Sequence, residues 1–143
     1  PYRRQRQMCI RDRMDILQCL GTDLKTFFSD SEDTQVVFHK GDFFEKTDAE
    51  LKNRIEWIIP NAQKNMMEPI LVTIEPGGST YPDNPHEGEE FGYVLTGSIE
   101  IHLGGQVHKA KKRESFYFTP AQKHYITSKN GAEILWVSTP PSF

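Results

Sequence analysis

The sequence predicts an all-β fold built as a sandwich or barrel. The chain contains many short runs rich in β-branched and aromatic residues, each bounded by Gly, Pro, Asn or Asp. Their spacing is regular, and no segment between them is long and periodic enough to form a crossover helix. The length of 143 residues allows one domain with its own core and a short appendage.

The composition excludes several classes of protein. Hydrophobic residues make up 36% of the chain and charged residues 26%, as in an ordinary globular domain. No apolar run approaches the roughly 18–20 residues that cross a bilayer, and the charged start lacks the apolar stretch of a secretory signal. Cys9 and Cys19 offer neither a disulfide framework nor a metal-binding cysteine cluster. We therefore expect a cytoplasmic protein with no membrane partner.

The first thirteen residues differ in charge from the rest of the chain. Residues 1–13 contain five arginines against the single Asp12, whereas the remainder is acidic. A basic arm of this kind can bind nucleic acid. The run 8–13 instead resembles a translated sequencing-adapter end, so we interpret residues 1–13 as a non-native tail. The acidic remainder is a poor candidate for binding DNA by itself.

Residues 14–28 have a helical pattern, unlike the rest of the chain. Apolar residues recur there at spacings of three and four, which places them on one helix face. They are Ile16, Leu17, Leu20, Leu24 and Phe27. Gly21 marks a helix end, and Thr22 or Asp23 begins a second short turn. The polar residues 29–33 predict a linker. The simplest role for the helix is to dock against the β domain.

Strands are predicted from residue 34 onward. A first hairpin is expected around Gly41, and a polar connection follows over 48–53. Thr96-Gly97 and Gly104-Gly105 are predicted to close two tight hairpins. The predicted strands are residues 35–39, 42–44, 54–59, 69–75, 92–95, 98–103, 115–119 and 132–138.

Three side chains in this pattern suit a divalent cation. His86 and Glu90 are four residues apart, so on an extended backbone they point to the same face. His124 follows Pro120 at the end of a strand about thirty residues later. Two imidazoles and a carboxylate from two strands suit a first-row metal such as zinc, iron or manganese, with positions open for a ligand.

The spacing of these residues resembles that of the cupin superfamily. The first cupin motif is His-x-His, three or four residues, Glu, six residues and Gly, and it maps onto Asn84, His86, Glu90 and Gly97. The second motif has Gly-Asp before an aromatic strand, then Pro, a small residue and His. It maps onto Arg113-Glu114, residues 116–118, Pro120 and His124. The resemblance implies a small double-stranded β-helix, the cupin jelly-roll barrel.

The resemblance also implies that His86, Glu90 and His124 are three of the four metal ligands of the family. The first ligand position is occupied by Asn84, whose carbonyl oxygen is a weak ligand beside imidazole. Arg113-Glu114 and Gln122 are further departures from the motif, in place of Gly-Asp and Gly.

A second interpretation of the same residues is a binding pocket without a metal. His86, Glu90 and His124 would then hydrogen-bond a small organic acid or amine directly, and Tyr93 and Tyr117 could line the pocket. A third is a purely structural role. The remaining histidines are interpreted as surface residues or as core residues whose hydrogen bonds are satisfied. They are His39, His102, which should face outward, and His108.

Residues 86–95 and the C-terminal run 135–143 are similar to the sensor domain of bacterial helix-turn-helix regulators of the XRE type. In such proteins a DNA-binding bundle precedes a linker and a cupin. The resemblance implies that residues 14–28 are the remnant of the helix-turn-helix domain, 29–33 the linker and 34–143 the cupin sensor domain. The recognition helix would lie upstream.

The sequence therefore predicts the effector-binding domain of a transcriptional regulator rather than an enzyme. A small-molecule effector would bind at the barrel, a homodimer would space two DNA-binding heads, and DNA would be contacted only through the missing N-terminal domain. One alternative is a stand-alone metal-dependent cupin enzyme, such as a dioxygenase or isomerase. Another is a plain sugar- or acid-binding module without a regulatory role.

Overall fold

The computed structural model describes residues 35–143. Within this range, His39–Ser142 form one compact unit, to which the following description refers. The predictions for residues 1–13, 14–28 and 29–33, and for Cys9 and Cys19, lie outside the described residues.

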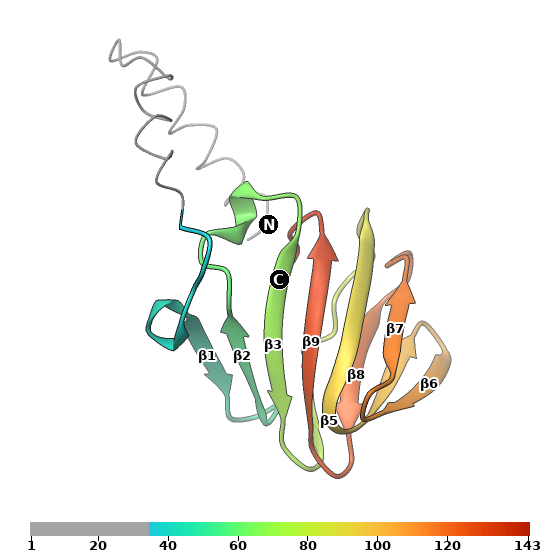
Figure 1. Cartoon of the computed structure of the whole chain (residues 1–143). Coiled ribbons are helices and arrows are strands. Elements are labelled where there is room, and N and C mark those ends of the chain that lie inside the picture. The colour runs from blue at the N-terminus through green and yellow to red at the C-terminus, as the bar shows by residue number, and fades with distance from the viewer. Residues whose placement is uncertain (1–34) are drawn as a thin grey trace. The chain divides into compact units, whose positions relative to one another are not determined.

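The unit is built almost entirely of strands, as the sequence predicts (Figure 1). The strands are β1 (Phe44–Asp48), β2 (Asn53–Trp57), β3 (Glu68–Ile74), β4 (Gly78–Ser79), β5 (Glu89–Leu103), β6 (Gln106–Lys111), β7 (Ser115–Phe118), β8 (His124–Ser128) and β9 (Ala132–Thr139). Two short 3₁₀ turns, η1 (Lys40–Asp42) and η2 (Ala62–Lys64), are the helical elements of the described part. Within that part no helix is long and apolar enough to cross a membrane.

The strands form two antiparallel sheets that share β5. The first sheet has the order β1-β2-β3-β9-β5-β7, and it uses the first half of β5. The second has the order β6-β5-β8-β4, and it uses the second half of β5, Ser98–Leu103. Such a pair of sheets joined by common strands is a jelly-roll barrel, which agrees with the all-β prediction.

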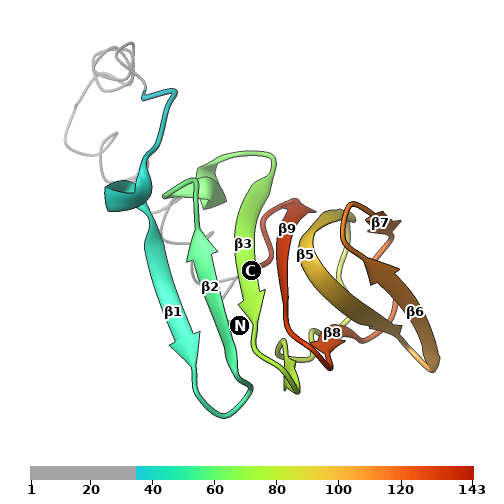
Figure 2. The same cartoon turned by 60° about the horizontal axis from the view of Figure 1, so that its bottom comes forward.

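The prediction of a tight hairpin at Thr96-Gly97 is wrong. β5 continues through these residues and changes partners there, from β9 and β7 to β6 and β8. A bulge between Val94 and Thr96 and a φ of 76° at Gly97 bend the strand rather than reverse it (Figure 2). The Gly104-Gly105 hairpin, between β5 and β6, is present as predicted.

The inner faces of both sheets form the core. In β3 and β9 every second side chain is buried, which is the period expected of strands with one face covered. Each isoleucine buried in this way contributes about 1.5–3 kcal/mol relative to an exposed one. The buried hydrophobic side chains include Ile70, Val72, Ile74, Val94, Ile99, Ile101, Phe116, Phe118, Ile126, Ile134 and Trp136.

The hairpin predicted around Gly41 is also wrong. Residues 35–39 are not a strand, and the Asp42 side chain accepts a hydrogen bond from the His39 backbone N–H at 3.1 Å, which closes the η1 turn instead. The predicted strand 42–44 shares only Phe44 with β1, and three further strands were not predicted. They are β4, which has two residues, β6, whose edge position leaves most side chains exposed, and β8.

Candidate metal and ligand site

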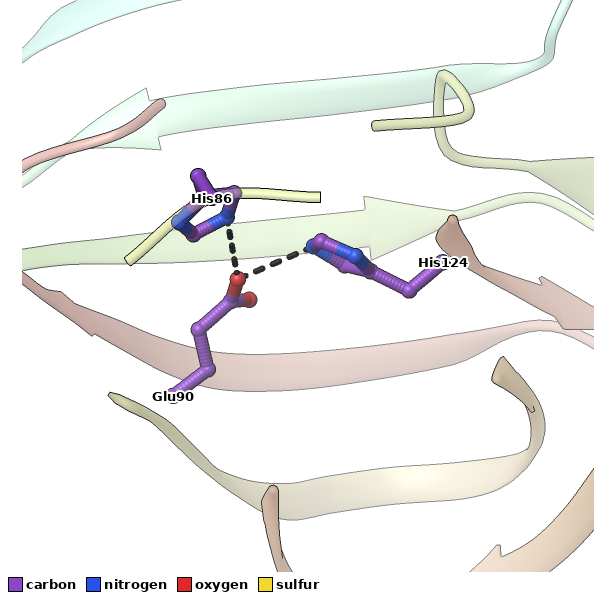
Figure 3. Close-up of side chains that lie close together, drawn as sticks. All are labelled: His86, Glu90 and His124. Atoms are coloured by element: carbon purple, nitrogen blue, oxygen red, sulfur yellow. Dashed lines mark ion pairs between the residues drawn. The ribbon is translucent and has the colours of Figure 1, made fainter. Parts of the chain in front are cut away.

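Three side chains converge inside the barrel. Glu90 projects from the inner face of β5, His124 is the first residue of β8, and His86 lies in the loop that precedes β5. The Nε2 atoms of His86 and His124 each lie 2.9 Å from Oε2 of Glu90 (Figure 3). Glu90 and His124 each have an exposed fraction of 1%. We refer to these residues as the His86–Glu90–His124 cluster.

Backbone carbonyl groups fix the orientation of both imidazoles. Nδ1 of His86 lies 3.0 Å from the carbonyl oxygen of Glu87, and Nδ1 of His124 lies 2.8 Å from that of Gln122. A carbonyl oxygen only accepts, so each Nδ1 carries the proton and donates it. The opposite nitrogen of each ring, Nε2, therefore faces Glu90. The edge of the Phe118 ring packs against His124, with the ring centroids 5.3 Å apart.

This arrangement brings acceptors together. With Nδ1 protonated, a neutral imidazole presents a lone pair at Nε2, and an ionised Glu90 presents further lone pairs. Although the distances are short, neither imidazole Nε2 nor either Glu90 oxygen has a partner with hydrogen-bond geometry, and all four atoms are buried. Buried acceptors that converge on one point need a cation between them, either protons or a metal ion.

The donor atoms fit a single metal ion. One atom from each of His86, Glu90 and His124 lies within 4.8 Å of the others. Protein ligands lie about 2.0–2.2 Å from such ions, so two ligands at the right angle of octahedral coordination lie about 3 Å apart. The observed separations of 2.9 Å agree with this value. The carbonyl-bound Nδ1 atoms are also the usual second contact of metal-binding histidines.

The cluster perturbs the protonation of its own members when no metal is bound. Burial alone raises the pKa of Glu90, but the two imidazoles outweigh it, and the net pKa lies below its usual 4.5. Burial alone lowers the pKa of His124, but Glu90 and the Gln122 carbonyl outweigh it, and the net pKa lies above 6.5. Both shifts favour a carboxylate next to an imidazolium.

The structure does not bring Tyr93 and Tyr117 to the cluster. Side chains alternate along β5, so Glu90 points inward whereas Phe91 and Tyr93 point to the outer face of the sheet. Tyr117 pairs with Phe91 in register and is 61% exposed. Because side chains alternate between the two faces of a strand, these two tyrosines point away from the cluster, contrary to the expectation that they line the site. Asn84, at the missing ligand position, is exposed.

The other three histidines lie away from the cluster. His39 is exposed and lies 3.4 Å from Asp42. His102 stacks on Tyr125 with ring centroids 4.3 Å apart, and its Nε2 lies 3.0 Å from Oγ1 of Thr127. His108 is exposed on β6. Their interpretation as residues outside the site agrees with these positions.

One acidic residue near the cluster was missed by sequence reasoning. Oδ2 of Asp83 lies 3.9 Å from Nε2 of His124. The motif spacing pointed to the next residue, Asn84. The proximity arises from a backbone bridge between Asp83 and His124, which are 41 positions apart in the chain. No local pattern in the sequence reveals such a bridge.

The fold and the cluster together define a cupin-type barrel. The cupin domain family matches residues 70–138, so this segment of the chain is similar to cupin domains. The matched segment begins in β3 and ends in β9, so it includes all three members of the cluster.

Several known proteins are similar to this chain. The HTH-type transcriptional regulator PuuR of Escherichia coli is 28% identical over 134 residues, which cover 90% of this chain and 71% of the regulator. The cupin domain of an XRE-family transcriptional regulator from Enterobacter cloacae superposes with a TM-score of 0.56 at 16% identity, covering 64% of this chain and 99% of that domain. A predicted oxalate decarboxylase from Thermotoga maritima superposes with a TM-score of 0.62 at 16% identity, covering 73% and 98%. The two structural likenesses show the fold.

Proposed function

We propose that the barrel is the effector-sensing domain of a transcriptional regulator, and that it binds a small molecule together with a divalent metal at the His86–Glu90–His124 cluster. The observation that carries the binding proposal is the convergence of buried acceptor atoms at that cluster. The regulatory part is supported by the similarity to PuuR, which extends beyond the cupin domain.

The extent of that similarity supports the proposed domain order. The described residues 35–143 make up about three quarters of the chain, whereas the match covers 90% of it. The match therefore includes part of residues 1–34. We assign residues 14–28 to the end of a DNA-binding domain, 29–33 to a linker and 34–143 to the sensor domain, with residues 1–13 a non-native tail. DNA would be contacted through the helix-turn-helix domain.

His86, Glu90 and His124 would hold the metal through two Nε2 atoms and one carboxylate oxygen. Such an ion, zinc, iron or manganese, supplies a positive charge that can attract an anionic or carbonyl group of the effector. The protein's own contribution is to orient both imidazoles through Glu87 and Gln122 and to exclude water from Glu90.

Regulation would follow from a difference in effector affinity between two arrangements of the DNA-binding heads. A homodimer is the natural assembly, because operators are usually two-fold symmetric and the two heads must be spaced along the DNA. Such a protein would act in the cytoplasm, where the DNA of a bacterium lies.

Metal analysis tests the site. We expect the purified protein, expressed with added zinc, iron or manganese, to retain about one ion per chain, and the His86→Ala and His124→Ala variants to retain none. A metal-free wild-type protein under each of these conditions would contradict the metal part of the proposal. A screen of small carboxylates and amines by ligand-detected NMR, against the same variants, would identify the effector class.

The second candidate function is a metal-dependent cupin enzyme. The observation in its favour is the donor set, since two histidines and one carboxylate leave positions open for a substrate. The coding sequence upstream of Met14 distinguishes the two candidates. An in-frame helix-turn-helix of about 60 residues supports the regulator, and a start codon without one supports the enzyme.

A further inference from the structure

Asp83 stands beside the cluster in a way that the cupin motif does not anticipate. We propose that Asp83 is a fourth protein ligand of the cation held by His86, Glu90 and His124, in place of the imidazole that the motif has at Asn84. The inference rests on the metal site proposed above and adds one residue to it.

The distance from Asp83 to the cluster suits a shared ion. Oδ2 of Asp83 lies 3.9 Å from Nε2 of His124. Two ligands of one ion, each about 2.0–2.2 Å from it, lie between about 3 Å apart at a right angle and about 4.4 Å apart on opposite sides. The separation of Asp83 and His124 falls within this range. Asp83 is not among the residues whose ligand atoms all lie within 4.8 Å of one another, so its side chain would turn towards an ion held by the cluster.

The backbone fixes Asp83 relative to His124. The N–H of Asp83 donates to the carbonyl of His124 at 2.8 Å, and the N–H of His124 donates to the carbonyl of Asp83 at 3.0 Å. This isolated bridge holds the two residues opposite each other. The Asp83 side chain is 36% exposed, so it stands at the rim of a cluster whose other members are nearly buried. Asn84 takes no part in this bridge, and its side chain is exposed.

The chemistry of the buried members points to a cation. Glu90 and His124, each 1% exposed, have acceptor atoms without hydrogen-bond partners. A second carboxylate from Asp83 would bring the donor set to two imidazoles and two negative charges, which neutralise a divalent ion. Oxygen ligands suit Mn²⁺ and Fe²⁺ better than imidazole does. Replacing an imidazole by Asp83 therefore shifts the site towards these harder ions.

The test is a titration of the metal-free protein with Mn²⁺. Binding is measured by calorimetry and, independently, by the loss of the EPR signal of the free ion. We expect Asp83→Asn to raise the Kd for Mn²⁺ by at least roughly 10- to 100-fold. The matched control Asn84→Ala should leave the Kd unchanged. The double variant Asp83→Asn/Asn84→His should recover affinity, because it restores the imidazole of the motif. Urea unfolding in EDTA checks that each variant folds as the wild type does.

The outcomes separate the two proposals. Mn²⁺ binding by the wild type with an unchanged Kd in Asp83→Asn would overturn the role of Asp83 and leave the three-residue site intact. A loss of affinity in Asp83→Asn that disappears in about 1 M salt would also overturn it, because a ligand bond is not screened whereas a distant charge is. Equal, negligible binding of Mn²⁺ and Zn²⁺ by wild type, Asp83→Asn and His124→Ala would overturn both.

Discussion

At the scale of single residues, the charge state of the cluster depends on what fills it. One oxygen of Glu90 faces two imidazole nitrogens whose other nitrogens are committed to backbone carbonyls. Protons can satisfy this arrangement at low pH. At higher pH the protons leave, and the acceptors that remain need a metal ion. Protons and metal thus compete for the same atoms.

The first prediction concerns the pH dependence of the metal-free protein. The lowered pKa of Glu90 stabilises the fold above its unfolded value of 4.5, and this contribution is lost as the pH falls through the folded value. The raised pKa of His124 stabilises the fold below 6.5, and this contribution is lost as the pH rises through the folded value. The free energy of unfolding in EDTA should therefore be largest between pH 4.5 and pH 6.5, the unfolded-state pKa values of Glu90 and His124. Urea titrations across the pH range measure it.

The matched variant for this prediction is Glu90→Gln. The amide of the variant is uncharged and can donate a hydrogen bond to one neutral imidazole. The free energy of unfolding should therefore fall less steeply as the pH rises above the ordinary histidine pKa. A wild-type protein whose stability in EDTA rises steadily from acidic to mildly alkaline pH would contradict the assignment of His124.

A second residue-scale prediction concerns Arg113. Its φ of 71° lies in the left-handed region, which glycine adopts easily and which costs other residues about 1–2 kcal/mol. The cupin motif has Gly at this position, and Glu114 accepts a hydrogen bond from the Lys111 N–H at 2.8 Å in the same turn. Arg113→Gly should raise the free energy of unfolding by about 0.5–1 kcal/mol. Urea unfolding measures the gain, and Arg113→Ala should show none.

At the scale of elements, β5 determines how the two sheets meet. Its first half carries Glu90 in one sheet, and its second half pairs with β8, which carries His124. The bend at Gly97 brings the chain from one sheet to the other. A Cβ atom at this position would lie 2.0 Å from the carbonyl oxygen of Gly131. The bend therefore requires glycine both for its backbone conformation and for space.

The third prediction separates these two requirements. Gly77 has a similar φ of 80°, but a Cβ there would meet nothing within 4 Å. Gly77→Ala should therefore cost only the backbone penalty of about 1–2 kcal/mol. Gly97→Ala should cost about 2 kcal/mol more, or prevent folding, because the Gly131 carbonyl must also move. Urea unfolding of the two variants gives the difference, and equal costs would show that the bend tolerates a side chain.

Sequence patterns predicted the central strands better than the edges and connections. The alternation in β3 and β9 locates both within one residue at each end, because one face of each is buried. β6 shows no such alternation, since it is an exposed edge. The continuity of β5 through Gly97 was missed because a glycine after Thr96 signals a turn whether the chain bends or reverses.

The same limits apply to the candidate site. Motif spacing pointed to His86, Glu90 and His124, although only Glu90 lies on β5 and His124 at the start of β8, whereas His86 lies in the loop before β5. The register from Glu90 to Tyr93 is uninterrupted, with the bulge only after Val94, so Tyr93 must point outward. Asp83 could not be predicted from the sequence, because its position next to His124 depends on backbone pairing between segments that are distant in the chain. Local patterns predict which face a side chain occupies, and long-range pairing decides which faces meet.

At the scale of the whole domain, the cluster connects parts of the chain that are otherwise linked through the core. Glu90 lies in the first sheet, His124 in the second, and His86 in the loop before β5, where its backbone N–H donates to the Pro120 carbonyl at 2.9 Å. An ion shared by these residues would bind the folded state and not the unfolded chain. Metal binding should then stabilise both sheets as one unit.

The fourth prediction follows from this coupling. At a free metal concentration of 100 times the Kd, binding should add about 2.7 kcal/mol to the free energy of unfolding. For a domain of this size that gain corresponds to a rise in Tm on the order of 10 °C. Differential scanning calorimetry with metal and with EDTA measures the shift.

The His124→Ala variant should abolish this shift in Tm, whereas Asn84→Ala should preserve it because Asn84 is exposed. A Tm that responds equally to metal in wild type and His124→Ala would place the ion elsewhere on the protein. A single transition that moves as a whole would show that the metal stabilises both sheets together.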